Sequence, residues 1–226
     1  MMYALAVLVA ASVVGLIVVA RATRRLDAKE SGSLSALAES LVWCDGDLSP
    51  NGRRVLLVEP AATSFVSSTG SPEGAAWFAA GCPIDEKELV TRLPEEPVKE
   101  KVSWSLTGDE VARLRQGFTP AALEDKWRIV TLPVEDGERV FLLRSWTGAL
   151  VYVLDLAPHG VRWVWRGAKD PLGVEIARAI TDGYALDKPC VMPAPRELGD
   201  DKLRLMTWGL QMAGRRCKAV EPLAAG

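Results

Sequence analysis

The stretch that decides the fold of this chain is residues 125–166. It reads DKWRIVTLPVEDGERVFLLRSWTGALVYVLDLAPHGVRWVWR. Four apolar runs, rich in the β-branched and aromatic residues that strands favour, are separated there by turn residues. The runs are Trp127–Leu132, Arg139–Arg144, Leu150–Leu156 and Val161–Trp165. An Asp-Gly pair between the first two runs is a strong signal for a β-hairpin. The stretch therefore predicts a four-stranded antiparallel meander.

The first hairpin of this meander brings two groups of polar and aromatic residues together. Its loop is expected to consist of Asp136 and Gly137. Counting back along both strands then sets Trp127 opposite Trp146. The residues that meet there, called the sheet-end cluster below, are Asp125, Lys126, Trp127, Arg144, Ser145, Trp146 and Thr147.

Alternation along the strands sorts the side chains between two faces of the sheet. One face is expected to be apolar, and a helix over residues 171–182 would cover it. The other face is mixed and sets Asp155 opposite Arg162 as an ion pair. The apolar face would hold Val130, Leu132, Phe141, Leu143, Leu150, Tyr152, Leu154, Trp163 and Trp165.

Helix signals lie on both sides of the meander. Thr107 and Glu110 have the spacing of a capping box, and Gly117 marks the end of the helix that they begin. The apolar spacing predicts further helices over residues 171–182 and 200–215. We therefore expect an α+β fold, in which helices cover one face of the meander.

Two segments near the C-terminus carry no helix signal. Prolines at positions 189, 193 and 195 are expected to break any regular element between the last two helices. The tail beyond residue 215 is short and is expected to form no element of its own.

The N-terminus has the pattern of a membrane anchor. Residues 3–20 are apolar or small and carry no charge, which suits a single helix across the hydrocarbon core. No basic residue precedes them, whereas Arg21, Arg24, Arg25 and Lys29 follow. The positive-inside rule then places the rest of the chain in the cytoplasm. The alternative is a cleaved signal peptide, because Ala20-Arg21-Ala22 has the form of a cleavage site.

This reading divides the chain into three parts. Residues 1–22 form a single-pass anchor in the cytoplasmic membrane, residues 23–33 a juxtamembrane linker, and residues 34–226 a cytoplasmic α+β domain. A family-like core of that domain is expected over about residues 105–182.

Composition and motifs exclude several classes of protein. A formal net charge of −2 gives no basic surface for nucleic acid. His159 is the only histidine and lies in a Pro-Gly turn, so a histidine-based catalytic triad is not expected. Four cysteines, Cys44, Cys82, Cys190 and Cys217, lie far apart without zinc spacing. There is no phosphate-binding loop and no dinucleotide fingerprint. We expect no cofactor and no metal.

The sheet-end cluster carries a resemblance. Asp125-Lys126-Trp127 and Arg144-Ser145-Trp146-Thr147-Gly148, on either side of a hairpin, are similar to a signature of an uncharacterised family of small bacterial proteins. The resemblance covers about residues 105–156. It implies a shared domain and no activity.

Two interpretations of the cluster stay open. In the structural one, Trp127 and Trp146 form a cross-strand aromatic pair, and Asp125 pairs with Arg144 or Lys126. In the functional one, the guanidinium of Arg144 binds a phosphate or carboxylate and Lys126 adds a charge. Ser145 and Thr147 then supply hydroxyls, and the indoles supply a flat wall.

The functional expectation follows from these points. We expect a membrane-tethered, non-enzymatic binding module whose partner is a protein or a small anionic ligand. The alternative is a small enzyme or sensor that acts on a phosphorylated or nucleotide-like ligand at Arg144, Lys126 and Trp146.

Overall fold

The computed structural model describes residues 35–45, 53–58, 84–122 and 124–223. The chain divides into two compact units, Met1–Ser40 and Leu41–Gly226. In the first unit residues 35–40 are helical, and the expected anchor and linker lie outside the described residues. No helix within the described ranges is long and apolar enough to cross a membrane. Two sheets and several helices make the second unit an α+β structure.

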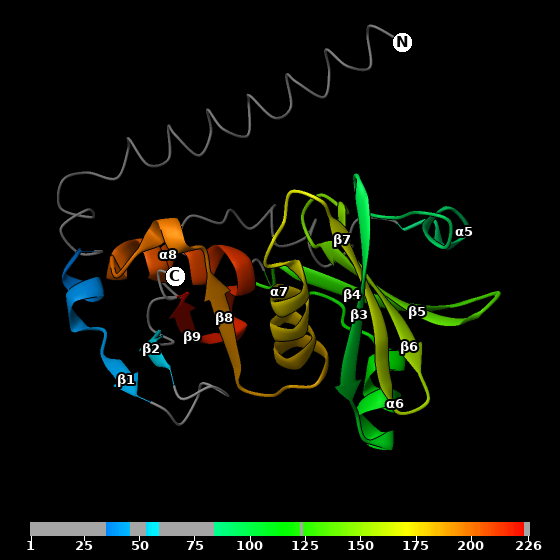
Figure 1. The fold of residues 1–226 in the computed structure, drawn as a ribbon, viewed down its shortest axis with the longest axis horizontal. Coiled ribbons are helices and arrows are strands. Elements are labelled where there is room, and N and C mark those ends of the chain that lie inside the picture. Colours follow the sequence, from blue (N-terminus) through cyan, green and yellow to red (C-terminus); the bar gives the residue numbers. More distant parts are fainter. Residues whose placement is uncertain (1–34, 46–52, 59–83, 123, 224–226) are drawn as a thin grey trace, which may run out of the picture. The chain divides into compact units, whose positions relative to one another are not determined.

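The larger sheet has five strands in the order β3-β7-β6-β5-β4 (Figure 1). Their bounds are β3 Pro97–Ser105, β4 Trp127–Val134, β5 Gly137–Arg144, β6 Leu150–Ala157 and β7 Gly160–Gly167. The expectation of four strands is wrong, because β3 pairs antiparallel with β7, from Pro97 opposite Gly167 to Ser105 opposite Gly160.

The hairpin register also differs from the expected one. Glu135 and Asp136 form the loop, so Trp127 lies opposite Arg144 rather than Trp146. This shift of two positions keeps the same residues of β4 and β5 on each face. Leu150 stays on the face of Leu143 as expected, but β6 changes faces from Tyr152 onward, because a register irregularity between Leu142 and Leu143 sets Tyr152 opposite Leu142.

Helices cover the sheet face that holds Trp127, Leu142 and Tyr152. The helices α6 (Gly108–Gln116) and α7 (Gly173–Ile180) lie against β4 and β7 respectively. Gly173 lies so close to the Arg166 side chain that a Cβ at this glycine would approach Arg166 Cδ to 2.6 Å. Arg166 points away from the face of its neighbour Trp165. The expectation that residues 171–182 cover Trp163 and Trp165 is therefore wrong.

The two tryptophans lie on the opposite face and are half-buried. Trp165 packs there against an apolar cluster under the short helix α5 (Glu86–Leu89). That cluster consists of Leu89, Leu132, Phe141, Leu143 and Val153. Asp155 lies opposite Trp163 and pairs with Arg139 and Lys99, each at 3.0 Å, so its expected pairing with Arg162 is also wrong.

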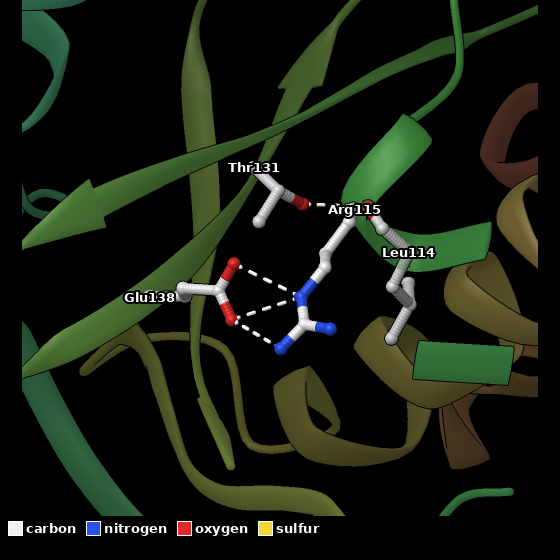
Figure 2. Close-up of polar contacts among 4 residues, drawn as sticks. All are labelled: Leu114, Arg115, Thr131 and Glu138. Carbon is white, nitrogen blue, oxygen red and sulfur yellow. Dashed lines mark hydrogen bonds and ion pairs between the residues drawn. The ribbon is translucent and has the colours of Figure 1, made fainter. Parts of the chain in front are cut away.

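The capping box of α6 is present as predicted. Thr107 Oγ1 accepts from the Glu110 amide, and Glu110 Oε2 accepts from the Thr107 amide at 2.8 Å. Figure 2 shows how the end of the helix is held on the sheet. Thr131 Oγ1 donates to the Leu114 carbonyl at 2.6 Å, and the Arg115 guanidinium forms a bidentate pair with Glu138. The Leu114 carbonyl in the last turn of the helix thus accepts from a strand residue as well as from the Gly117 amide at 3.0 Å.

The smaller sheet has the order β1-β2-β9-β8, and its last pair is parallel. Its strands are β1 Trp43–Asp45, β2 Arg54–Leu57, β8 Cys190–Ala194 and β9 Cys217–Pro222. The helix α8 (Lys202–Ala213) packs on this sheet, and α7 contacts both β7 and β8 (Figure 1).

Both expectations for the C-terminal part of the chain are wrong. Pro193 lies within β8, which a proline tolerates because β8 is an edge strand. The tail forms β9, where Ala219 and Val220 are fully buried between two neighbouring strands.

Three short helical turns complete the second unit. They are the π-helix η1 Thr181–Ala185 and the 3₁₀ turns η2 Arg196–Leu198 and η3 Gly214–Arg216. The π-helix continues α7, so the helical segment extends beyond the predicted end at residue 182. Before α7, Asp170 Oδ2 accepts from the Tyr152 hydroxyl at 2.6 Å.

Candidate functional site

The sheet-end cluster lies where β4 begins and β5 ends. The Ser145 amide donates to the Lys126 carbonyl at 3.1 Å, which extends the pairing of the two strands by one step. A tight turn follows, in which Gly148 has a φ of +64° and its amide donates to the Arg144 carbonyl at 2.9 Å. The Ala149 carbonyl accepts from the Arg144 amide at 2.9 Å. Backbone hydrogen bonds therefore fix the cluster.

Trp127 forms the buried centre of the cluster. Its indole is fully buried, and Nε1 donates to the Met212 carbonyl. One ring face stacks on Tyr152 at 5.9 Å between centroids, and the Arg144 guanidinium lies over the ring at 4.4 Å. Because the register sets Arg144 opposite Trp127, the expected cross-strand pair of Trp127 and Trp146 is wrong.

Arg144 contacts the end of α8. Its Nη1 donates to the Gln211 carbonyl at 3.3 Å, and Nη2 donates to Met212 Sδ at 3.5 Å. Burial lowers the pKa of Arg144. Within the described ranges Arg144 forms no ion pair with Asp125, so that part of the structural interpretation is wrong.

These contacts cap the C-terminus of α8. Its last carbonyls have no partner inside the helix and carry the negative end of the helix dipole. Arg144 donates to the Gln211 carbonyl and Trp127 donates to the Met212 carbonyl. The Tyr184 hydroxyl donates to the Ala213 carbonyl at 2.7 Å. The cluster therefore joins the larger sheet to the helix that packs on the smaller one.

Asp125 supports the segment before β4. Its carboxylate is buried, and Oδ2 accepts from the amides of Ala121 at 2.9 Å and Ala122 at 3.2 Å. Such bonds from a short acidic side chain to nearby amides stabilise a turn.

Lys126 and Trp146 form the outer part of the cluster. Lys126 Nζ lies 4.2 Å from the centroid of the Trp146 ring. Burial lowers the pKa of Lys126, and its amide donates to the Tyr184 hydroxyl at 3.0 Å. Trp146 is 46 % exposed, whereas the other described tryptophans are buried or half-buried.

The two hydroxyls of the cluster differ. Thr147 is exposed, and its Oγ1 accepts from the Ala149 amide at 3.2 Å within the turn. Ser145 is 6 % exposed, and its Oγ has no hydrogen-bond partner among the described residues. The structure thus brings all seven predicted residues to one end of the sheet. Trp146 and Thr147 are exposed there, Lys126 and Arg144 are half-buried, and Asp125, Trp127 and Ser145 are buried.

The sequence did not indicate the partners of the cluster. Gln211, Met212 and Ala213 end a helix that was predicted, but sequence periodicity does not show where a helix docks. Gly214 has a φ of +54°, and a Cβ there would lie 1.9 Å from the Glu124 carbonyl oxygen. A glycine directly after a helical stripe was the one available signal for this approach.

The chemistry open to this site is limited by its side chains. Among the described residues no three histidine, cysteine or acidic side chains are grouped to hold a metal ion.

Comparisons with protein families, with curated proteins and with solved structures gave no match to this chain. The resemblance of the cluster to a bacterial signature stays a prediction.

Proposed function

We propose that this chain is a non-enzymatic binding module that contacts a partner protein through Trp146 and Lys126. The observation that carries the proposal is the exposure of Trp146, a large indole held at the surface by a hydrogen-bonded turn. Tryptophan is enriched among the residues that dominate binding energy at protein interfaces. A side chain presented on rigid backbone loses little conformational entropy on binding.

The neighbouring ammonium group specifies the kind of partner. Lys126 lies on the Trp146 ring, and burial already disfavours its charged form. A partner with an apolar pocket and carboxylates at its rim would accept the indole and stabilise the ammonium. Asp125, Trp127 and Arg144 then serve to hold the turn in place.

The enzymatic alternative has less support. It needs the guanidinium fork of Arg144 to face a ligand. Arg144 donates instead to the Gln211 carbonyl and Met212 Sδ, and the Trp127 ring covers one side of it.

The membrane anchor belongs to the same proposal. Residues 3–20 would hold the binding module at the cytoplasmic side of the membrane, with residues 23–33 as a linker. A reporter fused to the C-terminus should be active in the cytoplasm, because the basic residues follow the apolar segment. Activity of a periplasmic reporter at that position would overturn the topology.

Photo-crosslinking in cells tests the binding surface. A photoreactive residue at Ala149, which is exposed beside Trp146, should give a discrete crosslinked product. Trp146→Ala and Lys126→Glu should each abolish the product. Arg162, exposed on β7, is the matched control position and should give none. If the product persists in the Trp146→Ala variant, the proposed contact is wrong.

A further inference from the structure

A basic hollow lies apart from the exposed turn of Trp146, beside the π-helix and β9. Its volume is about 400 Å³, which is within the range of small-molecule sites. The residues that line it are Gly183, Asp187, Lys188, Arg216 and Lys218. Three of the lining side chains are cations and one is a carboxylate, and the Glu110 carboxylate pairs with Lys188 beside them.

Two of the cations are held in fixed positions. Lys188 Nζ pairs with Glu110, the capping-box residue of α6, and the Lys188 amide donates to the Asp182 carbonyl at 2.8 Å. The Arg216 guanidinium lies over the rings of Phe118 at 5.2 Å and Tyr184 at 5.9 Å. Preorganised cations bind an anion at a lower cost in side-chain entropy.

Arg216 and Lys218 have the capacity to bind an anion. Arg216 Nε is buried and has no hydrogen-bond partner among the described residues. Lys218 is exposed and forms no ion pair within the described part of the chain. A guanidinium and an ammonium together match the geometry and charge of a phosphate group.

The π-helix packs closely against Cys190 and Arg216 beside the hollow. Gly183 is buried, and a Cβ there would lie 2.9 Å from Cys190 Sγ and 3.6 Å from Arg216 Cβ, so a glycine backbone forms this part of the wall. π-Helical turns are rare and are frequently found at functional sites.

Asp187 occupies the position that an anion would take. Its Oδ1 lies 3.0 Å from Arg216 Nη1, yet its side chain is 69 % exposed. Its φ is +53°, a left-handed conformation that aspartate and asparagine tolerate better than other residues with a Cβ. A carboxylate so placed competes with a ligand and is free to move into solvent.

We propose that this hollow binds the phosphate group of a small soluble molecule through Arg216 and Lys218, with Asp187 as an internal competitor. The site is independent of the partner surface at Trp146, and neither proposal requires the other. The volume favours a small molecule, since the hollow exceeds what a single phosphate group fills.

Calorimetric titration of the full-length chain with inorganic pyrophosphate at constant ionic strength tests the proposal. Lys218→Gln should weaken binding by about tenfold or more, because a charged hydrogen bond is lost. Asp187→Asn should strengthen binding several-fold, because it removes the competing charge and keeps a residue that tolerates the left-handed conformation. Lys101→Gln, at an exposed lysine of β3, is the matched control and should leave affinity unchanged.

Two results would overturn the assignment. One is equal affinity of the Lys218→Gln and Lys101→Gln variants for pyrophosphate, and the other is no gain on Asp187→Asn. A second titration, with a soluble short-chain phosphatidylglycerol in place of pyrophosphate, separates a lipid source of phosphate from a soluble one. We expect wild type and Lys218→Gln to bind it equally weakly; tenfold weaker binding by the variant than by wild type would assign the hollow to lipid headgroups instead.

Discussion

At the scale of residues, the sheet-end cluster shows that the chemical type of a side chain does not by itself determine its role, which also depends on where that side chain lies. An arginine beside two tryptophans suggested a ligand site, yet Arg144 and Trp127 donate hydrogen bonds to the last carbonyls of α8. The sequence alone could bring these residues together, because the hairpin is local. It could not show which of them face inward, because that depends on a helix about 70 positions further along the chain.

Arg144→Lys tests this role of the guanidinium. A lysine cannot stack as a plane on Trp127 and donate to Gln211 at the same time. We therefore expect the free energy of unfolding to fall by about 1–2 kcal/mol in a denaturant titration. Arg115→Lys, at an exposed pair with Glu138, is the control and should leave the midpoint unchanged. Equal behaviour of the two variants would remove the capping role.

At the scale of elements, the capping box was predicted correctly and the strand register was not. The capping box at Thr107 and Glu110 lies within four residues, so this short segment of sequence is sufficient to predict it. From Tyr152 onward β6 was assigned to the wrong faces, because an irregularity between Leu142 and Leu143 shifts its pairing. Apolar residues on both sides of the strand hide this shift.

Two glycines that follow helical turns test how α8 is held. Gly214 and Gly199 have similar φ values, +54° and +56°. A Cβ at Gly199 would meet no atom within 4 Å, so Gly199→Ala should cost only about 1–2 kcal/mol. Gly214→Ala should cost more than about 3 kcal/mol, because the Glu124 backbone must move. Equal melting temperatures for the two variants would show that α8 ends elsewhere.

At the scale of the whole molecule, the predicted meander covered β4 to β7 of the larger sheet but not its fifth strand, β3. The smaller sheet was not predicted. The smaller sheet pairs β2 with β9, which lie far apart in the sequence, and its strands are only three to six residues long. No local pattern specifies such pairing. The sheets are joined by α7, which contacts β7 and β8, and by the capped end of α8. The turn that carries Trp146 lies beside the second of these.

The denaturant midpoints of Trp127→Ala and Trp146→Ala, measured side by side, test this account most directly. Trp127 is fully buried and Trp146 is 46 % exposed, although both belong to the same cluster. We expect Trp127→Ala to lose about 3–5 kcal/mol of stability. Trp146→Ala should stay within about 0.5 kcal/mol of wild type, as a surface residue kept for binding would. A Trp146→Ala variant as unstable as Trp127→Ala would contradict the account, because Trp146 would then belong to the core.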